Sequence, residues 1–583
     1  METEPEQPPD FARQDLTDAV TVALRRDGHL LTAGEHHIAR QFLALSAPAA
    51  SLYARLHSRR PILFRLDQLA YTEVPDVPAA AAELVAAGLV DRESILPTAS
   101  LLGLRTVAEL KVLCKAHGLK RSGKRELLLE RLSALPRSAA LLPALCLRHP
   151  RLFRRLCRLY LHDHSGDLSL LVMTRIGHVS FPEYTPTGGS GLFPDRRALV
   201  EYEALMQRRW HLTPEEAIAS LPVALALVSA RPMPAAHRYR FSARRFAADL
   251  SMWAARELER AKEHETAEAA YRALLSAGIR AAPAASLRRA MCLEALGRLP
   301  EAVQACADGR ETADDADVIA LDRTGRRLAR KAGVRWVPSP PLRTAPVREI
   351  DLAGAEMEGP RPGYVAGEGT AAVERALIVV LREAGRQVFF GESAPWSTLF
   401  ALLCHDAIFA PVPGMLPTPM LHRPLDLGAE GFAERRAAWL EPIFARVSAG
   451  DAPALLAAAL PRLEGVSLAG ARWDRFTPAQ LTELVAGLDG PSLSGILRCF
   501  AEDYRTANRG LPDLCILPGP EVRLAGALPG RIPPTLLLAE VKGPGDSLRD
   551  VQKVWMSRLL DLGVPTELWK VRRKATRSRR RSG

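Results

Sequence analysis

The chain has 583 residues, of which 48% are hydrophobic and 25% charged, a composition typical of globular proteins. At roughly 100–200 residues per domain, this length predicts about three to five domains. Lys and Arg outnumber Asp and Glu by 78 to 66, and the net charge of +12 favours a polyanionic partner. No apolar run approaches the roughly 20 residues of a membrane span, and the acidic, Pro-rich start lacks the basic and apolar parts of a secretory signal. Eight scattered Cys without a C-x-x-C pair argue against a disulfide framework and a Cys-based zinc site.

Most of the first 340 residues are predicted to be helical, because Ala, Leu and Arg recur at three- and four-residue spacing. Thr106 and Glu109 match a capping box at the start of one helix, Gly118 can end it, and Ser122 can cap a second. The loop between the two helices is basic, which suits the phosphates of duplex DNA. Its candidate DNA-binding residues are Lys120, Arg121, Lys124 and Arg125. A solvated loop without a ligand is the alternative.

Two similar segments follow in the next helical region. AEAAYRALL begins at Ala267 and PEAVQACAD at Pro300, 33 residues later. Helix pairs that repeat about every 34 residues are typical of tetratricopeptide repeats. Two copies are few, so ordinary helical hairpins are the alternative.

Strand patterns appear only near the end of the chain. Residues 514–517 and 535–542 are short β-prone runs, residues 547–562 are predicted to form a helix capped by Ser547 or Asp550, and residues 566–571 form a further strand. The order β-β-α-β describes a small α/β core. The Pro-rich stretch 335–352 is interpreted as a linker or domain entry before this region.

The α/β core carries the strongest chemical pattern, Pro512-Asp513 followed by Glu540-Val541-Lys542. Side chains at i and i+2 of a strand point to the same face, so Glu540 and Lys542 lie together. Two carboxylates can hold Mg²⁺ or Mn²⁺, and a lysine can stabilise charge on a phosphate. Gln552 on the following helix can reach the same place. The pattern predicts a metal-dependent nuclease, and its alternative is a structural α/β cap.

Two segments, GLPDL (510–514) and AEVKGPGDSLRDVQKVW (539–555), resemble the VRR-NUC branch of the PD-(D/E)XK nucleases. More widely, the chain resembles the Fanconi-associated nuclease family, in its bacterial-type form without a Cys/His ubiquitin-binding zinc finger. Residues 45–60, 181–205 and 473–505 are also similar, and residues 104–132 resemble the SAP domain of that family.

The resemblance implies a specific set of site residues. The metal ligands would be Glu392, Asp513, Glu540 and the backbone carbonyl of Val541, with Lys542 as the catalytic lysine. The complete set of expected catalytic residues is Glu392, Asp513, Glu540, Lys542 and Gln552.

Arg505 and Arg509 lie on the approach to Asp513 and are expected to hold DNA phosphate. Some family members anchor a 5′ phosphate in a basic pocket there. Asn508 and Val551 occupy the neighbouring positions in this chain, which puts a complete pocket in doubt.

The resemblance further implies a 5′-flap endonuclease and 5′→3′ exonuclease that requires Mg²⁺ or Mn²⁺. Its partner would be branched or flapped double-stranded DNA in interstrand crosslink repair, with no membrane, in a bacterial cytoplasm at the nucleoid. Two alternatives remain: a junction resolvase of the same superfamily, and a DNA-binding scaffold with an inactive nuclease fold.

The expected fold is therefore a mostly α-helical N-terminal two-thirds followed by a C-terminal α/β PD-(D/E)XK core. The expected parts are a helical domain (1–97), a SAP-like domain (98–136), a helical DNA-binding or linker region (137–248), tetratricopeptide-like repeats (249–345), a nuclease domain (346–573) and a basic tail (574–583). His162 and His164 flank Asp163, but without further ligands they do not predict a metal site.

Overall fold

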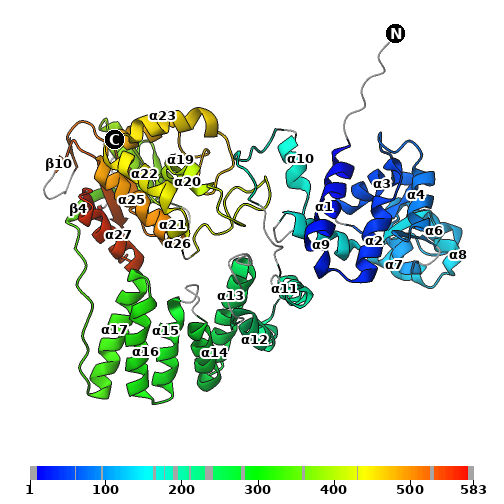
Figure 1. Cartoon of the computed structure of the whole chain (residues 1–583), viewed down its shortest axis with the longest axis horizontal. Coiled ribbons are helices and arrows are strands. Elements are labelled where there is room, and N and C mark those ends of the chain that lie inside the picture. Colours follow the sequence, from blue (N-terminus) through cyan, green and yellow to red (C-terminus); the bar gives the residue numbers. More distant parts are fainter. Residues whose placement is uncertain are drawn as a thin grey trace, which may run out of the picture. The chain divides into compact units, whose positions relative to one another are not determined.

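The computed structural model of the chain divides into two compact units by its internal contacts (Figure 1). The first comprises residues 1–180 and 189–200, and the second comprises residues 181–188 and 201–583. The structure describes residues 10–574 except 60, 94–95, 162–165, 176, 188–192, 194, 209–211, 230–239, 278–282, 358–361, 430 and 525–530. The basic tail beyond residue 574 and the His162–His164 segment lie outside the described residues.

The first unit is mostly helical, with one small sheet. Its helices are α1 (Phe11–Asp27), α2 (Ala33–Leu43), α3 (Ala47–His57), α4 (Val77–Ala86), α5 (Thr98–Gly103), α6 (Val107–Ala116), α7 (Arg125–Ser133), α8 (Arg137–Ala140), α9 (Pro150–Leu161) and α10 (Ser169–Arg175). Its strands are β1 (Leu63–Arg65), β2 (Val90–Arg92) and β3 (Ala144–Leu147), in the antiparallel order β1-β3-β2. Helix α1 packs on α3 and α9, around the buried aromatic side chains of Phe42, Tyr53 and Phe153.

The SAP-like helices are inserted into this unit. Helices α5–α8 lie in the chain between β2 and β3, while β3 pairs with both β1 and β2. Residues 144–161 therefore complete the first unit, whereas the sequence analysis places them with the region that follows. The three strands are too short to show a period-2 pattern, so the sequence carried little sign of their pairing.

The predicted helix–loop–helix is present. Thr106 and Glu109 form the capping box of α6, and Gly118 adopts a left-handed φ of +69° just beyond its end. The start of α7 differs from the prediction, because its N-cap is Lys124 without a side-chain hydrogen bond and Ser122 does not cap it. Arg131 instead braces the loop, donating to the carbonyls of Lys120 at 2.7 Å and Ser122 at 2.6 Å.

Consecutive helices pack against each other through the helical part that follows. They are α11 (Arg196–Arg208), α12 (Pro214–Ser229), α13 (Arg240–Arg260), α14 (His264–Ser276), α15 (Pro283–Ala295), α16 (Leu299–Thr312) and α17 (Asp315–Ala332). From α12 onward each helix contacts the next, as the row α15, α16 and α17 shows (Figure 1). The two similar segments fall on α14 and α16, so the 33-residue offset corresponds to one helical hairpin.

The C-terminal region is built on a seven-stranded sheet. Its strands are β4 (Val347–Ala355), β5 (Gly363–Ala366), β6 (Gly369–Ala371), β7 (Val388–Phe390), β8 (Leu514–Ile516), β11 (Leu537–Lys542) and β12 (Thr566–Lys574). The order is β6-β5-β4-β12-β11-β8-β7, with β4, β12 and β11 parallel and the other pairs antiparallel. A separate two-stranded ribbon joins β9 (Val522–Arg523) and β10 (Arg531–Ile532).

The predicted β-β-α-β order is confirmed as β8, β11, α27 (Asp550–Asp561) and β12. Strands β4 to β7 are additional. Strand β4 begins at Val347, inside the stretch 335–352 that was interpreted as a linker or domain entry, so the end of this stretch belongs to the sheet. Ile350 and Leu352 alternate with exposed neighbours along β4, which is the pattern of a strand with one buried face.

Helices cover both faces of the sheet. Helix α18 (Val373–Glu383) packs with Leu537, Ala539 and Val541, whereas α27 and a helical insertion pack with Leu536 and Leu538. The insertion joins β7 to β8 and consists of α19 (Ala394–Leu403), α20 (His405–Ile408), α21 (Phe432–Arg435), α22 (Ala437–Ser448), α23 (Ala452–Leu463), α24 (Pro478–Ala486), α25 (Gly490–Glu502) and α26 (Tyr504–Ala507). The expected fold class, helical regions followed by an α/β core, is confirmed.

The repeat helices are attached to the C-terminal sheet through α27, which lies beside α17 (Figure 1). Arg323 of α17 pairs with Asp550 at 2.7 Å, and Arg558 of α27 pairs with Asp315 at 2.6 Å. Among the described helices, none has the length and apolar character needed to cross a membrane.

Candidate active site

Two neighbouring strands bring the predicted carboxylates together. Asp513 directly precedes β8, and β8 pairs with β11 so that Leu514 lies opposite Ala539. Oδ2 of Asp513 accepts the backbone N–H of Val541 at 2.8 Å. Glu540 is fully buried because β11 lies inside the sheet, between β8 and β12. Asp513 and Glu540, 27 residues apart in the sequence, therefore lie together in the fold.

Lys542 and Gln552 both contact one oxygen of Glu540. Nζ of Lys542 lies 2.7 Å from Oε1, and Nε2 of Gln552 donates a hydrogen bond to the same oxygen. Gln552 also accepts the N–H of Arg549 at 3.0 Å, which makes it part of the N-terminal cap of α27. The helix begins at Asp550 with Arg549 as its N-cap, so the predicted cap by Ser547 or Asp550 is wrong.

The site disfavours negative charge in the absence of a cation. Burial raises the pKa of Glu540 to about 8, and repulsion from Asp513 adds to the rise against the opposing effect of Lys542. Burial also raises the pKa of Asp513, assisted by Glu374 and Glu392, while the N–H of Val541 and Lys542 oppose it. Two acids whose pKa values are raised mainly by burial need a positive partner to ionise at neutral pH.

Glu392 reaches this place from a distant part of the sequence. Strand β7 pairs with β8, and the N–H of Gly391 donates to the carbonyl of Asp513 at 2.7 Å. A Cβ on Gly391 would lie 2.8 Å from the backbone N of Cys515, so only glycine allows this approach. Trp396 of α19 fixes the turn by donating to the carbonyl of Gly391 at 2.8 Å. Glu392 is exposed and directly follows this junction, as the resemblance implied.

The residues fit a hard divalent cation. Oε2 of Glu540 is buried without a hydrogen-bond partner among the described residues, and the donors available are the oxygens of Asp513 and Glu540 and the carbonyl of Val541. Within the described part of the chain, no group of three or more His, Cys, Asp or Glu side chains is arranged to hold a metal ion. Glu392 is therefore near the pair, but it does not form a three-carboxylate cluster with it in this structure.

Glu374 is a candidate that the sequence analysis did not select. It lies in the first turn of α18 and is one of the charges that raise the pKa of Asp513. Its only sequence sign is an acid in the first turn of a helix, which commonly serves the helix dipole alone.

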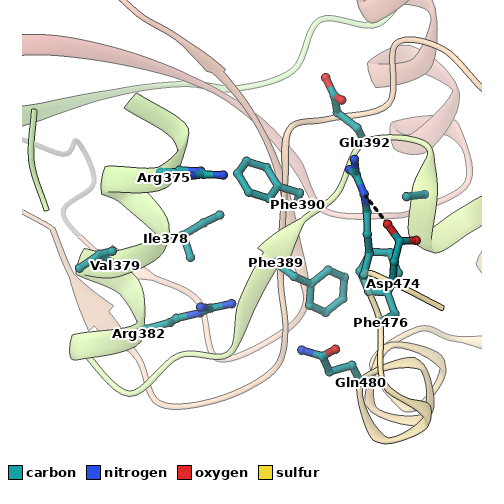
Figure 2. A pocket seen from close by; sticks show the side chains of 12 residues that line it. Arg375, Ile378, Val379, Arg382, Phe389, Phe390, Glu392, Asp474, Phe476 and Gln480 are labelled. Atoms are coloured by element: carbon teal, nitrogen blue, oxygen red, sulfur yellow. Dashed lines mark ion pairs between the residues drawn. The ribbon is translucent and has the colours of Figure 1, made fainter. Parts of the chain in front are cut away.

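A groove of about 800 Å³ adjoins Glu392 (Figure 2). Helix α18, the end of β7 and the start of α24 with its preceding loop form its walls. It is lined by Arg375, Ile378, Val379, Arg382, Phe389, Phe390, Glu392, Ala394, Asp474, Arg475, Phe476 and Gln480.

The segment before Asp513 packs closely against the start of α27. Gly510 has a φ of +86°, and a Cβ there would lie 2.8 Å from the backbone of Val551. The carbonyl of Asn508 accepts Oγ of Ser393 at 2.6 Å, which ties the segment to the Glu392 turn. Arg509 is exposed, while Arg505 is half-buried and its pKa is lowered by that burial. The predicted phosphate contact of these two arginines remains a prediction.

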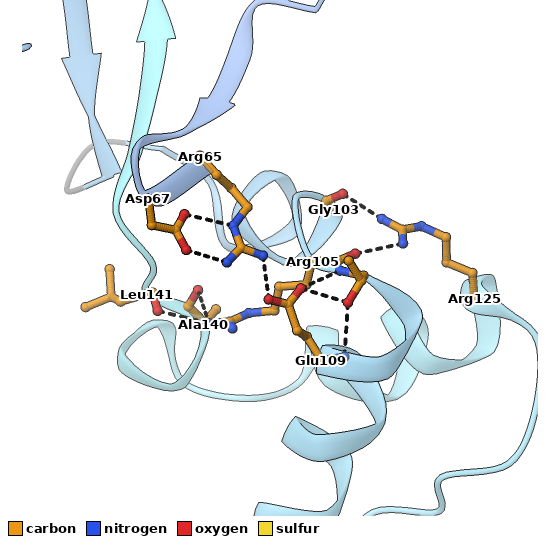
Figure 3. Close-up of polar contacts among 9 residues, drawn as sticks. Arg65, Asp67, Gly103, Arg105, Glu109, Arg125, Ala140 and Leu141 are labelled. Atoms are coloured by element: carbon orange, nitrogen blue, oxygen red, sulfur yellow. Dashed lines mark hydrogen bonds and ion pairs between the residues drawn. The ribbon is translucent and has the colours of Figure 1, made fainter. Parts of the chain in front are cut away.

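In the first unit, the basic loop is exposed at Lys120, Arg121 and Lys124. Arg125 instead donates to the carbonyls of Gly103 at 2.6 Å and Arg105 at 2.7 Å and so holds α7 to the end of α5 (Figure 3). The available cations of the loop are therefore the three exposed residues.

Arg65 at the end of β1 holds the inserted helices to the rest of this unit. It pairs with Asp67 at 2.6 Å and with Glu109 of the α6 capping box at 2.5 Å (Figure 3). The hydrogen bond from Arg65 lowers the pKa of Glu109 to about 2, and its bonds with Thr106 add to this.

Three family models match the chain: a FAN1 HTH domain at residues 14–91, a SAP domain at residues 101–133 and a VRR-NUC domain at residues 448–573. The VRR-NUC match contains Asp513, Glu540 and Lys542, and the SAP match contains the basic loop. The resemblance to the Fanconi-associated nuclease family is confirmed.

Relatives from distant organisms agree with this assignment. The chain is 28% identical to the Fanconi-associated nuclease 1 homolog of Pseudomonas aeruginosa, over 94% of this chain and 93% of that protein. It is 26% identical to the homolog of Oryza sativa and 27% identical to Fanconi-associated nuclease 1 of Homo sapiens, and in each case it spans 62% of the relative's length. A crystal structure of paFAN1 bound to 5′-flap DNA superposes with a TM-score of 0.77 and 25% identity, covering 98% of this chain and all of that one.

Proposed function

We propose that this chain is a structure-selective DNA nuclease that requires Mg²⁺ or Mn²⁺, cuts 5′ flaps and degrades DNA in the 5′→3′ direction. One observation carries the proposal: Glu540 is buried with an unpaired carboxylate oxygen, beside Asp513 and in contact with Lys542. A buried polar atom without a hydrogen-bond partner is costly, and such groups persist mainly where they serve a function.

The residues of the chain have distinct roles in this reaction. Asp513, Glu540 and the carbonyl of Val541 would hold the cation, with Glu392 nearby as a further ligand. The bound cation supplies Lewis acidity toward phosphate oxygens and lowers the pKa of water. Lys542 stabilises the negative charge that builds on the phosphate, and Gln552 fixes the orientation of Glu540.

Flapped duplex DNA is the proposed substrate. The superposed paFAN1 was crystallised with 5′-flap DNA, and the match extends over nearly the whole chain. The SAP-like loop offers three exposed cations for duplex phosphates. We place the activity in the repair of interstrand crosslinks, on the basis of the family resemblance.

The test is cleavage of end-labelled 5′-flap, 3′-flap, nicked and four-way-junction DNA by the full chain. Each substrate is incubated with Mn²⁺, with EDTA and with the variant Asp513→Ala. Incision near the 5′-flap junction that needs the metal and is lost in the variant is the expected result. Preferential cutting of the four-way junction would favour a resolvase instead, and selective binding without incision would favour a scaffold.

A further inference from the structure

The groove beside Glu392 combines a stacking surface with cations. Phe390 is 40% exposed, which is unusual for a phenylalanine at the end of a sheet strand, and Arg375 points toward it from α18 (Figure 2). Arg475, which lies in the loop before α24, adds another cation to the groove, and its side chain is exposed. Aromatic faces next to arginines are the combination that proteins use to bind single-stranded nucleic acid.

The walls of the groove are fixed in place. Arg382 donates twice to the carbonyl of Val388, at 2.8 and 3.2 Å, which joins α18 to β7. Phe389 packs edge-on against Phe476, with ring centroids 5.4 Å apart, which joins β7 to the start of α24. The groove is therefore preformed, and binding would not require ordering of its walls.

Its charge favours an anion. Two acids line the groove. Asp474 accepts two hydrogen bonds from Arg472, at 2.9 and 2.8 Å, and its Oδ2 also lies 3.9 Å from Nε of Arg475, so two arginines share one carboxylate. The other acid, Glu392, belongs to the catalytic centre. The three arginines of the lining, Arg375, Arg382 and Arg475, thus leave a positive field around Phe390.

The groove is continuous with the reaction site. Phe390 lies opposite Leu514 in the sheet, and Leu514 directly follows Asp513 in the chain. Phe390 itself lies two residues before Glu392. A strand cut at Asp513 and Glu540 therefore passes this groove within the next nucleotides. Its volume of about 800 Å³ suits one or two unpaired nucleotides, whereas the bases of a duplex are stacked inside the helix and cannot reach Phe390.

We propose that this groove binds an unpaired nucleotide of the DNA substrate next to the scissile phosphate, with its base stacked on Phe390 and its phosphates near Arg375 and Arg475. The proposal rests on the proposed nuclease function, which it deepens by assigning where the unpaired strand lies. It gives the nuclease a reason to prefer junctions, because only a strand that leaves the duplex can fill the groove.

The test measures binding in EDTA, where no cleavage is expected, with the full chain and flap DNA that carries 2-aminopurine at one unpaired position at a time. The parent protein should change the 2-aminopurine fluorescence at one or two adjacent positions only. Phe390→Ala should lose this change and weaken flap binding about tenfold, with unchanged affinity for a nicked duplex that has no unpaired nucleotide. Arg375→Gln should weaken flap binding in the same selective way.

Two further variants keep the result interpretable. Phe390→Tyr retains a ring and should restore the fluorescence change. Trp439→Ala removes another exposed aromatic, 41% exposed on α22 and outside the groove lining, and should behave as the parent. A fluorescence change that persists in Phe390→Ala, or equal weakening on flap and nicked DNA, would overturn the proposal.

The outcome is separable from that of the cleavage assay. Loss of the signal in Phe390→Ala together with no cleavage by the parent would support the groove and refute the nuclease. Normal cleavage by the parent, together with a Phe390→Ala fluorescence change equal to that of the parent, would support the nuclease and refute the groove.

Discussion

The side-chain amide of Gln552 connects the start of α27 to the catalytic strand through Glu540. Its oxygen accepts the N–H of Arg549 at 3.0 Å, and its nitrogen donates to Oε1 of Glu540. Because one group makes both bonds, the position of the buried carboxylate is set by the end of a helix. Helix α27 is in turn held by the repeat helices through Asp550 and Arg558.

Gln552→Ala should therefore reduce cleavage without abolishing it. The variant keeps Asp513, Glu540 and Lys542 but releases the orientation of Glu540, and loss of such a supporting contact typically costs roughly 10- to 100-fold in activity or metal affinity. The measurement is the cleavage rate of 5′-flap DNA as a function of Mn²⁺ concentration. Lys553→Ala, on the next position of the same helix, should retain the parent rate, and a Gln552→Ala enzyme equal to it would contradict the assignment.

Lys542→Ala should lose cleavage while flap binding stays close to that of the parent. The ammonium group contacts Glu540 inside the site, so its removal affects the transition state more than the hold on the duplex. A loss of about a hundredfold or more in rate is expected. Gel-shift affinity and single-turnover cleavage are measured side by side, with Lys331→Ala on α17 as the control. Normal turnover by Lys542→Ala would refute the catalytic role.

The unfolding free energy should depend on pH through Glu540. The folded chain holds the proton of Glu540 up to a pKa of about 8, whereas the unfolded chain releases it near its ordinary value of 4.5. The contribution of this proton to the free energy of unfolding is fully present below the pKa of Glu540 in the unfolded chain. It is lost as the pH rises through the pKa of Glu540 in the folded chain.

Glu540→Gln removes this dependence, because an amide stays neutral at every pH. In EDTA the variant should match the parent at about pH 4 and exceed it at about pH 9, by roughly 2–4 kcal/mol at most. The difference in unfolding midpoint between the two proteins is the measured quantity. A constant difference across the pH range would show that Glu540 is already ionised in the folded chain.

The basic residues of the loop should fall into two groups, those whose removal weakens DNA binding and one whose removal lowers stability. Removing Lys120, Arg121 or Lys124 should weaken duplex binding alike for all sequences and lower the slope of log affinity against log salt by about 1 each. Arg125→Ala should instead lower the stability of the first unit by about 1–2 kcal/mol, because its bonds to Gly103 and Arg105 are lost. Salt titrations and thermal unfolding distinguish the two effects, and an Arg125→Ala protein that loses only affinity would contradict this division.

The geometry of the candidate site could be predicted because its information is local. Asp513 adjoins one strand, Glu540 and Lys542 share the next, and Gln552 follows on a helix whose apolar stripe is regular, so pattern and spacing suffice. The capping box of α6 was predictable for the same reason, since Thr106 and Glu109 are only three residues apart.

The parts of the fold and site that the sequence pattern did not predict depend on strand pairing between segments far apart in the chain. Glu392 and Asp513 meet because β7 pairs with β8 across an insertion of more than a hundred residues, and only the family resemblance joined them in the sequence. Strands β5 to β7 have three or four residues each, too few to show alternation. Strand β4 did show alternation at Ile350 and Leu352, but the prolines before it favoured a linker or domain entry.

The insertion between β7 and β8 also determines when the candidate site can assemble during synthesis of the chain. A ribosome releases Glu392 long before Asp513, Glu540 and Gln552, and the core around the insertion helices is completed only when Leu538 of β11 and Trp555 of α27 have also emerged. Strand β7 has no partner in the sheet until β8 emerges, and this pair joins the rest of the sheet only through β11. An interrupted translation product would therefore carry the N-terminal helices and the exposed basic loop, but it would lack the candidate site.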